Sequence, residues 1–109
     1  MAEKNLEISV LSDIYAPLLP EKQQIALEYY YDEDLSLAEI AEHAGISRQG
    51  VRDQIKHAES QLIGYEKALG LYDKSKKTEK IINELEEIAQ ELENSKLKEL
   101  AEKLRAIYE

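Results

Sequence analysis

Apolar side chains recur along this chain at spacings of three and four residues, which place them on one face of an α-helix. Residues 5–16 form the first such segment, and Pro17 marks where the helix ends. Its inner face consists of Leu11, Ile14, Tyr15 and, just beyond, Leu18. Pro20 suits the first turn of a second helix that runs to about Tyr31. The inner face of this helix consists of Ala26, Leu27 and Tyr30. The pattern therefore predicts two core helices at the start of the chain.

Residues 36–62 carry the most specific pattern. Ser36 and Glu39 have the capping-box spacing, which predicts the start of a third helix. Gly45 permits the positive φ needed to leave that helix, and Ile46 is expected to fill the core from the turn. Ser47 suits the N-cap of a fourth helix. The apolar positions are Leu37, Ile40 and Ala41 in the third helix and Val51, Ile55, Ala58 and Leu62 in the fourth. Two capped helices joined by a glycine turn predict a helix-turn-helix.

Beyond this motif, the fourth helix is expected to continue towards Gly70, which could end it or be absorbed near its end. The polar residues 73–80 suit either a connection or a helix start. Two apolar seams of helical spacing follow: Ile81, Leu85, Ile88 and Leu92, and then Leu97, Leu100, Leu104 and Ile107. Because the register breaks near Asn94 and Ser95, we expect a turn between two antiparallel helices. We predict an all-α fold with a helix-turn-helix domain at 1–72 and a C-terminal helical hairpin or extension at 73–109.

The two C-terminal seams leave two arrangements open. They could pair with a second copy in a homodimer, or they could fold back on residues 5–31 of the same chain. Truncation of residues 73–109 would unfold the monomer in the second case and merely dissociate a dimer in the first.

Composition narrows the class of protein. A chain of 109 residues, 43% of them hydrophobic, supports one small core with an extension. It has no cysteine and two histidines, so we expect no disulfide, no metal site and no cofactor. The N-terminus lacks the pattern of a signal peptide, and no apolar run approaches the ~20 residues of a membrane span, so a soluble, cytoplasmic protein is expected. The absence of a glycine-rich phosphate loop or a nucleophile motif predicts a protein that is not an enzyme.

Charge restricts any contact with nucleic acid to a small area. The net charge of −9 argues against a general nucleic-acid binder. The candidate binding residues lie at the start of the fourth helix: Ser47, Arg48, Gln49, Arg52 and Lys56. Arginine can pair with phosphate or guanine, glutamine with adenine, and lysine with phosphate. Asp53 lies among them and repels phosphate unless it accepts from cytosine or orients an arginine, so weak DNA affinity is expected. The alternative is that these are ordinary solvated side chains or ion pairs.

Two other clusters are expected to be structural. Tyr29, Tyr30 and Tyr31 point about 100° apart on a helix and cannot form one stacking surface for bases, so core and rim positions are expected. The acidic residues 32–34 are expected to form a solvated connection and not a cation site.

Three stretches resemble the YlxM family of small bacterial helix-turn-helix proteins: residues 29–42 (YYYDEDLSLAEIAE), 46–56 (ISRQGVRDQIK) and 65–67 (YEK). The resemblance covers roughly residues 5–72, and the helical C-terminus more loosely. The motif is also similar to the promoter-reading fourth region of sigma factors, but the turn followed by Val51 and Asp53 favours YlxM. This resemblance implies an all-helical fold and a proposed regulatory role in the signal recognition particle pathway. It matches Ser47, Arg48, Gln49 and Lys56 to the family's recognition-helix pattern, whereas Gly50 and Arg52 depart from it.

Our leading hypothesis is therefore a regulatory helix-turn-helix protein of that pathway, which contacts nucleic acid or the particle's protein or RNA through residues 47–56. A sequence-specific DNA-binding transcription regulator is the first rival. The second rival is a protein-interaction module that binds no nucleic acid.

Overall fold

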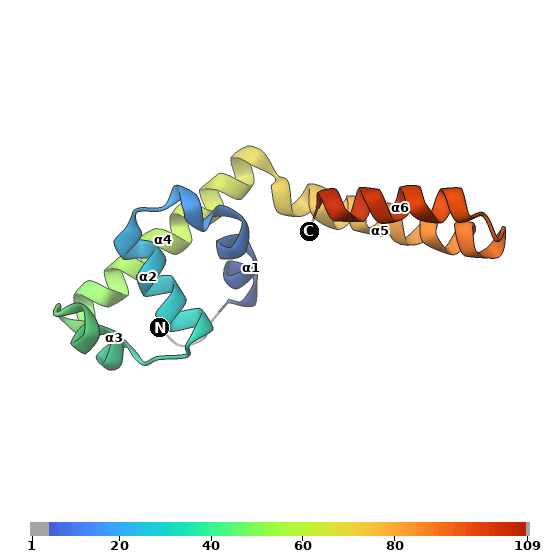
Figure 1. Cartoon of the computed structure of the whole chain (residues 1–109). Coiled ribbons are helices and arrows are strands. Elements are labelled where there is room, and N and C mark those ends of the chain that lie inside the picture. The colour runs from blue at the N-terminus through green and yellow to red at the C-terminus, as the bar shows by residue number, and fades with distance from the viewer. Residues whose placement is uncertain (1–4, 109) are drawn as a thin grey trace. The chain divides into compact units, whose positions relative to one another are not determined.

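The computed structural model describes residues 5–108, which form helices and no strand (Figure 1). The chain divides at Gly70 into two compact units. The N-terminal unit contains α1 (Leu6–Tyr15), α2 (Glu21–Leu27), α3 (Leu37–Ala44) and α4 (Arg48–Leu69). The C-terminal unit contains α5 (Leu71–Glu91) and α6 (Ser95–Ile107). The predicted all-α class with a helix-turn-helix and a C-terminal hairpin is confirmed.

Helix α1 begins where the side chain of Asn5 accepts a hydrogen bond from the backbone N–H of Glu7 at 2.9 Å. It is followed by a 3-10 turn, Ala16–Leu18, with Pro17 near its start. The expectation that Leu18 faces the core is wrong: its side chain is 55% exposed, and Leu19 is buried instead. Leu18 ends the 3-10 turn and Leu19 follows it in extended backbone, with φ −89° and ψ 150°, so the periodicity of the preceding helix no longer decides which side chain turns inward.

Helix α2 follows Pro20 and continues into a π-helical turn, Glu28–Asp32. Its predicted inner face is confirmed, since Ala26, Leu27 and Tyr30 are all buried. The three neighbouring tyrosines do not form one flat surface, as expected: the ring of Tyr29 stacks on His43, and the rings of Tyr30 and Tyr31 meet edge to face with centroids 5.2 Å apart. The hydroxyl of Tyr31 donates to Glu59 Oε2 at 2.7 Å. The three rings therefore serve the packing of different elements.

The helix-turn-helix has the caps that the sequence predicts. Ser36 and Glu39 form a reciprocal capping box, with backbone-to-side-chain distances of 3.1 and 3.2 Å. Gly45 leaves α3 with a φ of 70°, and the Ser47 hydroxyl accepts the Gly50 N–H at 3.0 Å. The expected core position of Ile46 is wrong, because its side chain is 40% exposed.

Helix α4 is the central element of the N-terminal unit. Helices α1, α2 and α3 all pack against it (Figure 1). Its predicted inner face is fully buried, with Val51, Ile55, Ala58 and Leu62 each 0% exposed. Gly70 ends the helix with a φ of 63°, which decides between the two roles that the sequence left open for it. Burial of one whole face of α4 fixes which of its residues point outward.

The C-terminal unit is an antiparallel pair of helices. Helix α5 already begins at Leu71, so residues 73–80 are helical and do not form a connection. Asn94 follows the turn and caps α6, accepting hydrogen bonds from the N–H groups of Lys96 and Leu97 at 3.1 Å each. The buried residues among those described in this unit are Ile82, Ala89 and Ala101.

No helix within residues 5–108 has both the length and the apolar character needed to cross a membrane.

Candidate recognition surface on the fourth helix

The candidate binding residues occupy the outer side of the first turns of α4. Because Val51 and Ile55 face the core, the positions between them are directed towards solvent. Arg48, Gln49 and Lys56 are exposed, and Arg52 is half-buried. Four of the five residues that the sequence singled out thus lie on α4, and Ser47 is its N-cap.

The basic side chains form a row along the helix. Arg48, Arg52 and Lys56 are spaced four residues apart, so they follow one another on consecutive turns. Gly50 is two residues from Arg48 and from Arg52 and so points to another side of the helix, where an added Cβ atom would lie 3.3 Å from the Ser47 hydroxyl oxygen. The row is a local group of cations in a chain whose net charge is −9.

Gln49 and Asp53 are joined by a hydrogen bond that the sequence analysis missed. The side-chain amide of Gln49 donates to Asp53 Oδ1 at 2.8 Å, and both residues are exposed. A bidentate contact to adenine uses the amide oxygen and one of the two amide N–H groups of glutamine, so the bond to Asp53 occupies the other N–H group and restricts the orientation in which Gln49 can meet that base. Asp53 therefore pairs with Gln49, a partner different from the arginine that the charge pattern suggested. The four-residue spacing was the signal that could have revealed this pair.

Ser47 has a local structural role at this surface. Its hydroxyl oxygen accepts the Gly50 N–H, which satisfies one of the free donors at the start of α4. The hydroxyl proton can still be donated to a ligand. Ser47 thus fixes where α4 begins, and thereby where Arg48 and Gln49 emerge.

A hollow of about 310 Å³ lies beside the turn and was not foreseen from the sequence. Ile25 of α2 and Ile46 of the turn line it, and they are 41% and 40% exposed. Tyr29 and His43 also line it, with ring centroids 5.6 Å apart and planes inclined by 30°. The signal available in the sequence was Ile46, which the apolar pattern assigned to the core.

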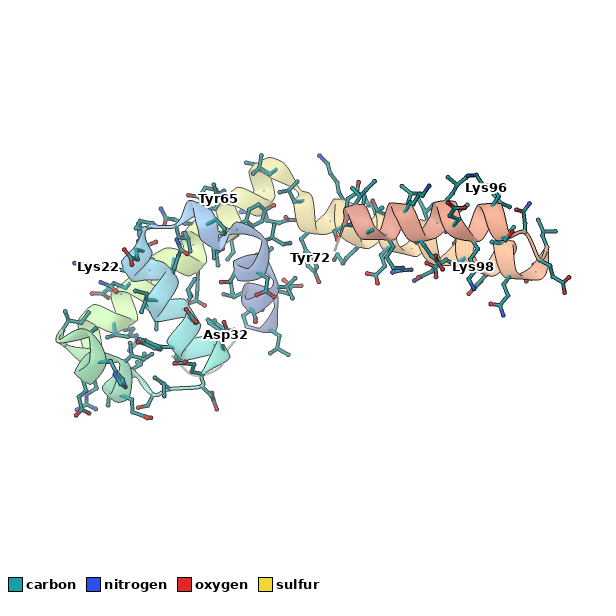
Figure 2. The ribbon with its side chains drawn as sticks, in the orientation of Figure 1. Lys22, Asp32, Tyr65, Tyr72, Lys96 and Lys98 are labelled. Carbon is teal, nitrogen blue, oxygen red and sulfur yellow. The ribbon has the colours of Figure 1, made fainter. Side chains whose placement is uncertain are left out.

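Lys22 of α2 also lines this hollow, and Figure 2 shows its side chain beside that helix. Among residues 5–108, no group of three or more histidine or acidic side chains is arranged to hold a metal ion. The start of α4 and the adjoining hollow together expose cationic, amide and apolar side chains, which are suited to binding another molecule.

Comparison with known proteins places the chain in a family. The family described as "Putative helix-turn-helix protein, YlxM / p13 like" (UPF0122) matches residues 2–104. A UPF0122 protein of Clostridium botulinum (strain Alaska E43 / Type E3) is 52% identical over 87 residues, covering 79% of this chain and 80% of the relative. One of Clostridium kluyveri is 41% identical over 103 residues, covering 94% and 93%. One of Desulforamulus reducens is 45% identical over 108 residues, covering 89% and 92%. The chain therefore belongs to the UPF0122 family of YlxM- and p13-like helix-turn-helix proteins.

Proposed function

We propose that this protein is a non-enzymatic regulator of the signal recognition particle pathway that binds nucleic acid or a protein of the particle through the start of α4. The supporting observation is the row formed by Arg48, Arg52 and Lys56, of which Arg48 and Lys56 are exposed and Arg52 is half-buried, on a helix whose inner face is fully buried. Packing of α4 against three helices fixes the backbone positions from which these side chains extend. The pathway itself is an expectation from the family resemblance.

The row suits a phosphate backbone better than a run of bases. Three cations that replace condensed counterions give a slope of roughly −3 in a plot of log affinity against log salt concentration. The bond between Gln49 and Asp53 restricts the orientation of one base-reading group, and the acidic remainder of the protein opposes contacts outside the row. We therefore expect weak, salt-sensitive binding.

The test is to measure binding of the full chain to particle RNA, to particle protein and to promoter DNA at physiological salt. Arg48→Ala and Lys56→Ala should each weaken binding to the true ligand and reduce its salt slope by about one if that ligand is RNA. Lys74→Ala, an exposed lysine of α5, is the matched control and should leave affinity unchanged. Absence of an interaction with every particle component would overturn the pathway assignment.

The main rival is a sequence-specific DNA-binding regulator. Arg48 and Gln49 favour it, because they project from the first turn of α4, the part of a recognition helix that contacts base edges. In this case, Arg48→Ala and Gln49→Ala should change the preferred DNA sequence, whereas Lys56→Ala should weaken all sequences equally. A selection experiment that yields no preferred sequence would exclude this function.

A protein-interaction module is favoured by the hollow between Ile25 and Ile46 and by the acidic surface. It predicts a partner complex that survives nuclease treatment, and Ile46→Asp should disrupt that complex while Arg48→Ala leaves it intact. A homodimer through the C-terminal helices is compatible with each of these functions.

A further inference from the structure

The α5–α6 hairpin has a polar face whose contacts define which residues lie side by side. Arg105 of α6 donates through Nε to Glu86 at 2.9 Å and through Nη2 to Asn83 at 2.7 Å. Its guanidinium also lies 3.8 Å from Glu79, one turn nearer the start of α5. Because Asn83 lies between those two glutamates in the chain, Arg105 is level with Asn83.

A second face of the hairpin is apolar. Because α5 and α6 are antiparallel, residue numbers rise along one helix as they fall along the other. With Asn83 level with Arg105, each large apolar residue of α5 is therefore level with one of α6, to within one residue. The four levels are Ile81 with Ile107, Leu85 with Leu104, Ile88 with Leu100, and Leu92 with Leu97. Seven of these eight side chains are between 36% and 73% exposed, and Leu97 is half-buried. A contiguous apolar face of this kind on a soluble helix pair marks an interaction surface.

The apolar seams of α5 and α6 each have buried apolar residues along one edge and exposed charged residues along the other. Ile82 and Ala89 follow seam residues of α5, and Ala101 follows one of α6; all three are buried. This edge of each helix therefore faces the other helix of the same hairpin. The opposite edge carries exposed charged residues that precede seam positions: Lys80, Glu84, Glu87 and Glu91 in α5, and Lys96, Glu99 and Lys103 in α6.

Two levels of these outer edges carry opposite charges. By the same register, Glu84 is level with Lys103 and Glu91 with Lys96, whereas Glu87 is nearly level with Glu99, a like charge. Within one hairpin these partners lie on opposite outer edges, and Lys96 and Lys103 instead approach Glu99 of their own helix at 3.9 and 3.2 Å. Glu84 and Glu91 can therefore approach lysines at their own level only across an interface with another hairpin.

We propose that a second copy of this chain covers the apolar face, with α5 of each copy lying against α6 of the other. The four apolar levels then become the layers of a four-helix bundle. Glu84 faces Lys103 of the second copy, Glu91 faces Lys96, and the symmetry axis repeats both pairs. The alternative in which α5 lies antiparallel to α5 brings Glu84 against Glu91 and Lys96 against Lys103, so like charges oppose it.

The test is the mass of the full-length protein in solution, measured by analytical ultracentrifugation over a range of protein concentrations. The wild type should dimerise. Glu84→Lys combined with Glu91→Lys should raise the dissociation constant roughly tenfold or more, because four attractive pairs become repulsive. Adding Lys96→Glu and Lys103→Glu to that variant restores opposite charges at every pair and should restore the dimer.

The matched control is Glu93→Lys combined with Glu102→Lys, which changes the net charge equally but lies on the polar face, around the hollow that Lys98 lines. Figure 2 shows Lys96 and Lys98 projecting to different sides of α6 near the turn. The control should dimerise like the wild type. A monomeric wild type, as expected if the hairpin folds back on its own chain or awaits another partner, overturns the proposal. An unchanged dissociation constant for the Glu84→Lys, Glu91→Lys variant, or failure of the four-fold variant to recover, overturns it equally.

Discussion

Helix α4 and the α5–α6 hairpin carry the same kind of apolar periodicity with opposite outcomes. Four seam residues of α4 are 0% exposed, whereas the seam residues of α5 are 36–65% exposed. The difference lies in what surrounds each helix: α4 is packed by α1, α2 and α3, while α5 has one neighbour, α6, within its unit. Periodicity thus predicts which face of a helix is apolar, and the number of available neighbours decides whether that face is covered.

Truncation of apolar side chains should lower the free energy of unfolding far more in α4 than in α5. Leu62→Ala in α4 should lower the free energy of unfolding of the N-terminal unit by about 2–5 kcal/mol, because it leaves a cavity in a closed core. Ile88→Ala in α5, where the side chain is 48% exposed, should cost less than ~1 kcal/mol in dilute solution. Denaturant unfolding followed by circular dichroism measures both. The contrast fails if the two losses are equal at low protein concentration; at high concentration a dimer would enlarge the loss at Ile88.

Helix caps provide the next contrast. Ser36→Ala removes half of the capping box of α3 and should cost about 1 kcal/mol in the N-terminal unit. Asn94→Ala removes two capping hydrogen bonds from α6 and should cost a similar amount, but it should affect only the hairpin. Amide hydrogen exchange resolves the two regions. Loss of protection in α4 on Asn94→Ala would show that the two units do not unfold separately.

Tyr31 should make the N-terminal unit sensitive to alkali. Burial, and then the hydrogen bond to Glu59, raises the pKa of Tyr31 above its usual value of 10.0. Above pH 10 the unfolded chain therefore loses this proton before the folded chain does, and stability falls as the pH rises towards the folded pKa. Tyr31→Phe should cost about 1 kcal/mol at neutral pH but flatten this alkaline decline. Denaturant unfolding at pH 7 to 11 measures both effects; an unchanged alkaline slope would contradict the assignment.

The smallest expected effect compares two glycines within α4. A Cβ at Gly64 meets no atom within 4 Å, so Gly64→Ala should stabilise the helix by about 0.5–1 kcal/mol. Gly50→Ala should gain less, because its Cβ would lie 3.3 Å from the Ser47 hydroxyl oxygen and would press on the cap. Melting temperatures measured side by side decide the order. An equal or larger gain at Gly50 would show that the cap yields freely.

Local chemistry alone was sufficient to predict several features. Ser36 with Glu39, Gly45 and Ser47 act through neighbours within a few residues, so their roles could be derived without knowing the fold. The inner face of α4 was predictable for the same reason, since Val51 and Ile55 repeat with the period of the helix.

Errors arose where the backbone changed pitch or where a neighbour was unknown. A 3-10 turn exchanged the roles of Leu18 and Leu19, and the position of Ile46 depended on how α2 and α3 meet around the turn. Among the candidate binding residues, exposure followed from helical periodicity. The four-residue spacing of Gln49 and Asp53 permits a hydrogen bond between their side chains but does not require one, since each has other polar side chains nearby in the sequence.

Interactions over one or two helical turns fix the helices, their caps, the helix-turn-helix and the outward position of Arg48, Gln49 and Lys56, and all of these could therefore be predicted from the order of residues. Tertiary structure alone decided that α4 is enclosed by three helices and that the seams of α5 and α6 are exposed. Burial is a property of contacts between distant segments, and an apolar pattern contains no information about how many such segments are within reach.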